Sequence, residues 1–144
     1  VPAVGTILKD AAAMPLSTGP DTLKDLRCLI VEDNMIIALD AEQLMNDHGM
    51  NEVYTAASVA EARKIIASQV LDIAVLDVNL GSETSFPLVG DLNERGIPFV
   101  FVTGYGEKVE LPDGAEEAQA VKKPFVSEEL IVAVARAVTN RRAS

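Results

Sequence analysis

Short, mainly apolar runs alternate along this chain with longer segments in which apolar residues recur at helical spacing. Unbroken apolar runs of strand length are typical of strands whose two faces are both covered. Strands that alternate with helices predict an α/β fold with a doubly wound sheet of five parallel strands. The expected strands are Leu26–Val31, Val53–Ala56, Ile73–Leu76, Phe99–Val102 and Ala118–Val121.

Capping and stop residues mark where the helices begin and end. Ser58 and Glu61 form a capping box, in which two side chains satisfy backbone N–H groups of the first turn. Gly49 and Gly96 each follow a periodic segment and favour its termination. Ser127, followed by two glutamates, is an expected N-cap. The expected helices are Met35–His48, Ser58–Ala67, Ser85–Arg95 and Ser127–Arg141.

The segment between Thr103 and Val121 breaks the alternation. A helix is due there, but Gly104, Gly106 and Pro112 each disfavour a continuous helix, and apolar residues at helical spacing are nearly absent. We therefore expect the fourth helix of the fold to be short or replaced by a loop.

The first part of the chain, Val1–Lys24, differs in composition from the rest. It is rich in Ala, Pro, Gly, Ser and Thr and has no sustained period. We expect a linker or N-terminal extension there and one domain over residues 25–144, because 144 residues suit a single core. The chain begins with Val1 and not Met, which suggests a processed or excised piece.

Polar residues follow the ends of four expected strands. Glu32 and Asp33 follow the first strand, Asp77 the third, Thr103 the fourth and Lys123 the fifth. The carboxyl ends of parallel strands line one crevice, so these side chains should meet. Three carboxylates in one place would repel one another unless a cation joined them, and hard oxygen ligands suit Mg²⁺. A lysine and a threonine add donors for phosphoryl oxygens, which predicts a phosphoryl-transfer site.

This ordered set resembles the receiver domain of two-component response regulators over about Leu26–Asn140. The resemblance implies a flavodoxin-like strand order of 2-1-3-4-5. It implies that Asp77 accepts a phosphoryl group from a histidine kinase in a Mg²⁺-dependent reaction, and that the domain then signals by a conformational change. A receiver is not an enzyme in its own right, although its acyl phosphate can hydrolyse.

The resemblance also assigns the other site residues. Asp33 and Asp77 would ligate Mg²⁺ directly, Glu32 would act through a metal-bound water, and the backbone carbonyl of Asn79 would complete the protein's share of the metal sphere. Thr103 and Lys123 would contact the phosphoryl oxygens. The peptide bond before Pro124 is commonly cis in the family, which aims the lysine inward.

A finer resemblance concerns the stretch Pro98–Gly106, which reads PFVFVTGYG. It is similar to receivers marked by a Phe-Ala-Thr-Gly-Tyr motif, with Val102 in place of the alanine, and Glu83 after the phosphoacceptor fits the same group. Such receivers stand alone or are attached to HWE-type histidine kinases. The resemblance thus implies a kinase of this type, in trans or in the same polypeptide, and leaves the downstream protein partner open.

One position departs from the usual receiver. An aromatic residue normally stands three residues before the lysine and moves when the threonine moves, but Ala120 is found here. Tyr105 is the nearby aromatic hydroxyl, and it either replaces the switch or covers the rim of the site. We expect its ring to shield the acyl phosphate from water, against an opposite effect of Asn79.

Two other functions use similar residues. An aspartate-nucleophile phosphatase or phosphotransferase would need a second Asp where Asn79 stands, and a non-phosphorylated flavodoxin-like interaction module would be expected to lack site residues. Locally, Glu32 and Asp33 could instead cap the helix that begins at Met35.

Charge and composition narrow the setting. The net charge of −10 argues against a nucleic-acid partner. The longest unbroken apolar run, Leu130–Ala135, is far shorter than the about 20 residues that span a bilayer, and the chain opens with no signal-peptide pattern. The single cysteine, Cys28, excludes a disulfide framework. We expect a cytoplasmic protein without a membrane partner.

Overall fold

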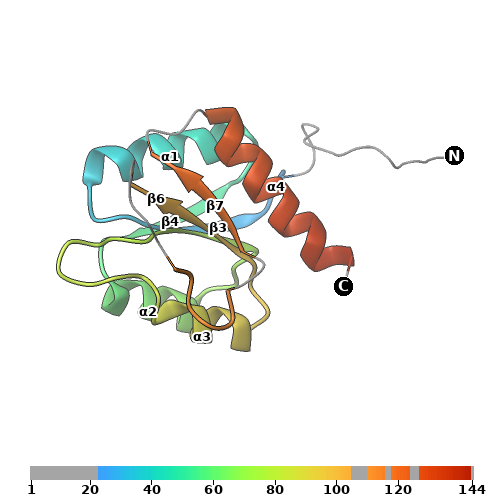
Figure 1. Cartoon of the computed structure of the whole chain (residues 1–144). Coiled ribbons are helices and arrows are strands. Elements are labelled where there is room, and N and C mark those ends of the chain that lie inside the picture. Colours follow the sequence, from blue (N-terminus) through green and yellow to red (C-terminus); the bar gives the residue numbers. More distant parts are fainter. Residues whose placement is uncertain (1–22, 105–109, 116–117, 124–126, 144) are drawn as a thin grey trace, which may run out of the picture.

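Five parallel strands form one sheet at the centre of the molecule (Figure 1). The computed structural model describes residues 23–104, 110–115, 118–123 and 127–143. The sheet order is β4-β3-β5-β6-β7, and every neighbouring pair is parallel. Counted along the chain this is the order 2-1-3-4-5, so the predicted fold is confirmed. The strands are β3 (Arg27–Val31), β4 (Glu52–Ala56), β5 (Ile73–Asp77), β6 (Phe99–Thr103) and β7 (Gln119–Lys122).

Helices cover both faces of the sheet (Figure 1). Buried residues of α1 and α4 belong to the hydrophobic cluster on one face, and those of α2 and α3 belong to the cluster on the other. This two-sided arrangement is the doubly wound architecture that the alternating pattern predicts. The helices are α1 (Met35–Asp47), α2 (Val59–Ser68), α3 (Leu88–Glu94) and α4 (Ser127–Ala143). In the described part of the chain no helix combines the length and apolarity that a membrane span needs.

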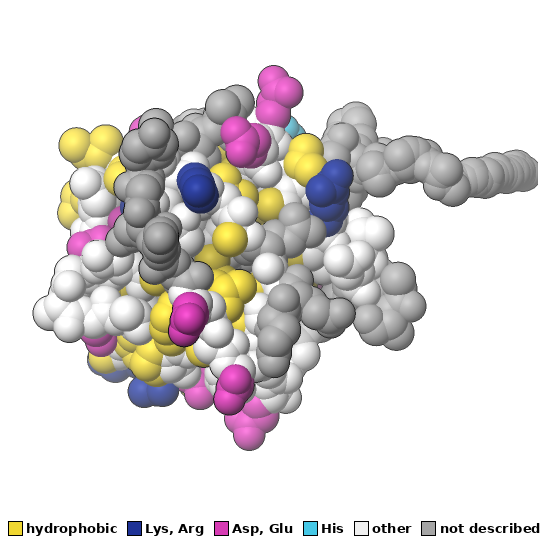
Figure 2. Space-filling model, viewed as in Figure 1, with side chains coloured by type: hydrophobic (Ala, Val, Ile, Leu, Met, Phe, Trp, Pro, Cys, Tyr) yellow, Lys and Arg dark blue, Asp and Glu magenta, His cyan; other side chains and the backbone are white. Residues whose placement is uncertain are grey.

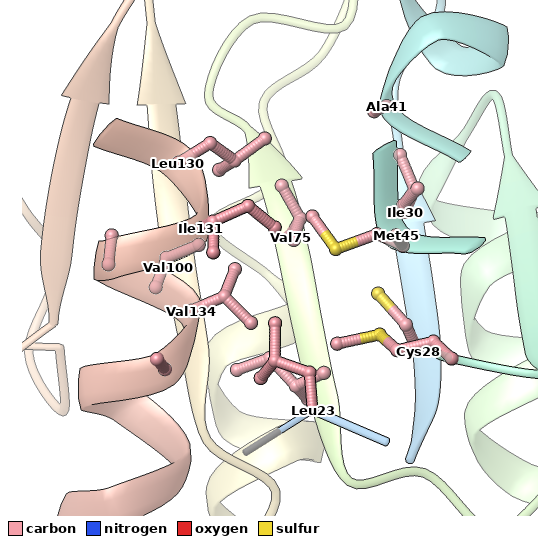
Figure 3. Packing of buried hydrophobic residues seen from close by; sticks show 14 of the residues in the cluster. Leu23, Cys28, Ile30, Ala41, Met45, Val75, Val100, Leu130, Ile131 and Val134 are labelled. Atoms are coloured by element: carbon pink, nitrogen blue, oxygen red, sulfur yellow. The ribbon is translucent and has the colours of Figure 1, made fainter. Parts of the chain in front are cut away.

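β3, β5 and β6 are mainly apolar because each contributes side chains to both clusters. Successive side chains of a strand point to opposite faces, so Cys28 and Ile30 pack with α1 and α4, whereas Leu29 and Val31 pack with α2 and α3. Figure 3 shows Cys28 and Ile30 beside Met45 within the first cluster. Burial raises the pKa of the Cys28 thiol to about 12, so the thiol stays protonated as a core residue.

The start of α3 is where the boundary prediction is wrong. The helix was expected from Ser85, but it begins at Leu88, after Pro87. The reason is a hairpin, here called the 78–85 hairpin, in which Asn79 and Thr84 form an antiparallel bridge. Ser85, which the sequence pattern assigns to the first turn of the helix, still belongs to this hairpin.

The segment between β6 and β7 contains no helix in its described residues, which are 104, 110–115 and 118. A turn closes there, with the amide of Ala115 donating to the carbonyl of Pro112 at 3.1 Å. Ala115 is buried among the residues that pack against α2 and α3. Over this described part, the expectation that the fourth helix is short or replaced by a loop is confirmed.

Candidate functional site

The predicted site residues lie at the carboxyl-terminal edge of the sheet. Asp77 and Thr103 are the last residues of β5 and β6, and Glu32 and Lys123 directly follow β3 and β7. Glu32, Asp77 and Thr103 are only 5–6% exposed. Because β3 and β7 flank the central strands β5 and β6, parallel pairing brings side chains from distant parts of the chain to one place.

Lys123 joins the two buried carboxylates. Its Nζ donates to Oε1 of Glu32 at 2.7 Å and to Oδ2 of Asp77 at 2.9 Å. The backbone amide of Lys123 also donates to the carbonyl of Thr103 at 2.7 Å, which fixes the start of this side chain beside β6. The ammonium thus offsets the repulsion between two carboxylates that burial has removed from water.

This charge arrangement shifts two pKa values upward. Burial raises the pKa of Glu32, and the neighbouring Asp77 raises it further, while the hydrogen bond from Lys123 opposes both. For Lys123, burial lowers the pKa, but the hydrogen bonds to Glu32 and Asp77 outweigh it, and the net shift is upward. The lysine is therefore an ammonium at neutral pH.

The acidic residues are close enough to share a cation. One carboxylate oxygen from each of Glu32, Asp33 and Asp77 lies within 4.8 Å of the others. Asp33 is exposed, so a hydrated ion can reach it from solvent. Hard oxygens with room for retained waters fit Mg²⁺. Among the described residues, three carboxylates and one ammonium lie at the site. The net charge of this group is negative, which also favours binding of a divalent cation.

The alternative in which Glu32 and Asp33 cap α1 is wrong, because Asn34 is the N-cap. Its Oδ1 accepts hydrogen bonds from the amides of Ile36 at 3.0 Å and Ile37 at 3.2 Å. Glu32 uses Oε2 to accept from the amide of Asn34, at 3.1 Å, and keeps Oε1 for Lys123. Capping therefore leaves the Asp33 carboxylate available to the site.

The 78–85 hairpin follows the phosphoacceptor candidate directly. The amide of Asn79 points to Oδ1 of Asp77 at 3.4 Å, which is a long contact. The hairpin hydrogen bonds run from Leu80 to the carbonyl of Glu83 and from Ser85 to the carbonyl of Val78. Neither bond uses the carbonyl of Asn79, the oxygen expected to serve the metal.

The Asn79 side chain is held within its own turn. Its Oδ1 accepts the amide of Gly81 at 2.9 Å, as in an Asx turn. A second contact of this loop was not predicted from the sequence: Oε2 of Glu83 accepts the amide of Val59 at 3.1 Å. Tyr105 and Pro124 lie outside the described residues, and Ala120 is exposed on β7.

Comparison with known proteins gives a consistent picture. The model of the response regulator receiver domain matches residues 28–135. The transcriptional regulatory protein PdtaR of Mycobacterium tuberculosis is 28% identical over 133 residues, covering 87% of this chain and 64% of that protein. The phyllosphere-induced regulator PhyR of Methylorubrum extorquens is 33% identical over 100 residues, covering 67% of this chain and 38% of that protein. This chain thus spans less than two thirds of either regulator's length.

Solved structures show the same fold. SdrG from Sphingomonas melonis superposes with a TM-score of 0.68 at 32% identity, covering 79% of this chain and 96% of that one. A response regulator receiver protein from Sinorhizobium medicae gives a TM-score of 0.73 at 24% identity, covering 83% of this chain and 98% of that one. The sheet and helices described above are therefore shared with both proteins.

Proposed function

Because the chain belongs to the response regulator receiver domain family, we propose that it takes a phosphoryl group from a histidine kinase onto Asp77. The observation that carries the proposal is the position of the Asp77 carboxylate. It is buried at the end of β5, paired with the Lys123 ammonium and within 4.8 Å of the Glu32 and Asp33 oxygens. No other aspartate in the described residues is buried.

In the proposed reaction an Asp77 carboxylate oxygen attacks the phosphorus of a phosphohistidine. The new oxygen–phosphorus bond forms as the phosphorus–nitrogen bond breaks, and the imidazole leaves with the bonding electron pair. Lys123 Nζ is already 2.9 Å from Asp77 Oδ2, so it can follow the charge onto the transferred oxygens. Thr103, on the neighbouring strand, provides a hydroxyl donor. The protein's contribution is positioning and electrostatic stabilisation.

Asp33, Asp77 and the carbonyl of Asn79 would hold Mg²⁺, with Glu32 acting through a bound water. When bound, the ion offsets negative charge on the transferring phosphoryl oxygens. Lys123 and the amide of Asn34 donate to the two oxygens of Glu32, an arrangement that is compatible with contact to the ion through a bound water. Asn79, which is not a carboxylic acid, also supports a receiver that accepts one phosphoryl group over an enzyme that turns over.

We also propose that the chain belongs to a particular group of receivers. The stretch Pro98–Gly106, which resembles the Phe-Ala-Thr-Gly-Tyr motif, supports a receiver of that group, served by an HWE-type kinase in the cytoplasm. With a loop in place of a helix in the described part between β6 and β7, we expect the output to be a rearrangement of this loop and not a helix tilt.

Metal dependence provides the first test. In wild type, Mg²⁺ should raise the thermal unfolding temperature and enable phosphorylation by acetyl phosphate, because a ligand that binds only the folded state stabilises it. Asp33→Ala should lose both effects. Thermal melts with Mg²⁺ or EDTA measure the first effect, and phosphate-affinity gels measure the second. A full Mg²⁺ response in the variant would remove Asp33 from the metal site.

A surface next to the site suits the kinase helix that carries the phosphohistidine. Met35, Ile36 and Leu39 of α1 are 56–75% exposed, and they begin two residues after Asp33. A groove of about 550 Å³ continues along α1 to Lys123. Asp40 and Asp47 line it, so basic partner side chains are favoured. Among the described side chains on the face shown in Figure 2, no continuous basic patch is visible.

The double variant Ile36→Ala with Leu39→Ala should slow transfer from the kinase about tenfold, equivalent to about 1.4 kcal/mol of lost contact energy. Phosphorylation by acetyl phosphate should stay at the wild-type rate, because the small donor needs no docking surface. Val70→Ala is the matched control, since Val70 is 67% exposed at the opposite, amino-terminal end of β5. Equal slowing with both donors would argue against docking on α1.

A further inference from the structure

The 78–85 hairpin that follows Asp77 is attached to a neighbouring helix by one side chain. Oε2 of Glu83 accepts the backbone amide of Val59, the first residue of α2, at 3.1 Å. Glu83 lies on the returning arm of the hairpin, where its carbonyl accepts the amide of Leu80 at 2.9 Å. The contact therefore joins the loop after the phosphoacceptor to the N-terminal turn of α2.

The first turn of α2 shows that this contact is separate from local capping. The N-cap Ser58 accepts the amide of Glu61 at 3.2 Å, and Glu61 Oε1 accepts the amide of Ala57 at 3.1 Å. This capping box is complete within residues 57–61. Glu83 supplies an additional acceptor from another part of the chain, and its negative charge suits the helix N-terminus.

The tip of the hairpin borders the metal site. Gly81 has φ +86°, and a Cβ there would lie 3.4 Å from Oδ2 of Asp33. Leu80 is buried in the core and holds one side of the tip. On the other side Oε2 of Glu83 contacts α2 through the amide of Val59. A displaced returning arm would therefore move the Asn79 carbonyl relative to Asp33 and Asp77.

We propose that Glu83 is a positioning residue for the metal site: by holding the amide of Val59, it fixes the 78–85 hairpin and with it the Asn79 carbonyl. The inference rests on the proposed function of Asp77 and Asn79. It adds a residue that touches neither the metal nor the phosphoryl group. The residue acts through the backbone of the hairpin.

Three variants separate positioning from helix capping. Glu83→Ala removes the acceptor, Glu83→Gln retains an oxygen for the Val59 amide, and Glu61→Ala removes a cap of the same helix that does not reach the hairpin. Isothermal titration with Mg²⁺ alone should give about tenfold weaker binding for Glu83→Ala, the range seen when outer-shell support is lost. Glu83→Gln and Glu61→Ala should bind Mg²⁺ close to wild type.

Amide hydrogen exchange in EDTA provides a readout that does not depend on the metal. The amides of Leu80 and Ser85 form the hairpin bonds, so they should exchange about tenfold faster in Glu83→Ala, through local opening. Glu61→Ala should leave both amides at the wild-type rate. The same exchange in Glu83→Ala and Glu61→Ala would overturn the inference and reduce Glu83 to a cap.

The two measurements also distinguish this inference from the proposed function. If wild type binds no Mg²⁺, the metal assignment fails, while the exchange comparison still decides whether Glu83 holds the hairpin. If wild type binds Mg²⁺ and Glu83→Ala binds it equally well, the positioning role is wrong and the proposed function stands.

Discussion

Asp77→Asn is expected to abolish phosphorylation by acetyl phosphate while leaving the protein folded. The amide keeps the size of the carboxylate and an oxygen for the Lys123 ammonium, but it is not a nucleophile. The substitution also removes one of the two carboxylates that Lys123 joins, so the thermal unfolding temperature in EDTA should not fall. Phosphate-affinity gels measure the modified fraction, and melting curves measure the fold.

Asp72→Asn is the matched control for this prediction. Asp72 immediately precedes the opposite end of β5, where its Oδ2 accepts the amide of Arg27 at 2.8 Å, and an asparagine oxygen can do the same. This variant should be phosphorylated like wild type. Undiminished phosphorylation of Asp77→Asn would show that the acceptor is another residue.

Lys123→Met is expected to have two opposite effects. The rate of phosphorylation should fall by about 100-fold or more, because a charge aimed at the transferring oxygens is lost. Mg²⁺ should nevertheless bind more tightly than in wild type, because the ammonium no longer competes for Glu32 and Asp77. If the lysine were only structural, its loss would lower the phosphorylation rate and the Mg²⁺ affinity together.

In EDTA the same variant should be destabilised by about 2 kcal/mol, because Glu32 and Asp77 then face each other without a cation. The loss is smaller than for a fully buried ion pair, because the lysine side chain is partly exposed. Urea unfolding with and without Mg²⁺ measures the loss and its recovery. Lys122→Met, at the exposed neighbouring position, controls for the loss of one positive charge. Wild-type phosphorylation in Lys123→Met would contradict the electrostatic role.

The fold was predictable because its three inner strands, β3, β5 and β6, are covered on both faces. In a chain of this size, an unbroken apolar run such as Phe99–Val102 is buried most simply as a strand whose sheet is covered on both faces. The start of α3 was not predictable. Ser85 has a favourable helix-start sequence around it, but the hairpin closed by the bridge between Asn79 and Thr84 takes up the chain before Leu88.

The topology of the sheet made it predictable that the site residues lie close together. Which of them form ion pairs was not predictable. Parallel strands place their carboxyl ends together, which is enough to gather Glu32, Asp77 and Lys123. The sequence does not say which oxygens the ammonium takes, because side-chain rotamers and strand register decide that.

The cap of α1 shows the same limit at short range. Asp33 and Asn34 are both good capping residues, and a difference of one position in the helix start decides which is used. The contact between Glu83 and Val59 depends on how the hairpin lies on α2, which no local pattern encodes.

Chemical trapping tests the central claim, that Asp77 carries the phosphoryl group, most directly. Wild type is incubated with acetyl phosphate and Mg²⁺, and borohydride then reduces the acyl phosphate before peptide mass spectrometry. We predict homoserine at position 77, dependent on both the phosphodonor and Mg²⁺ and absent in EDTA. Trapping at a different aspartate, with position 77 unmodified, would contradict it.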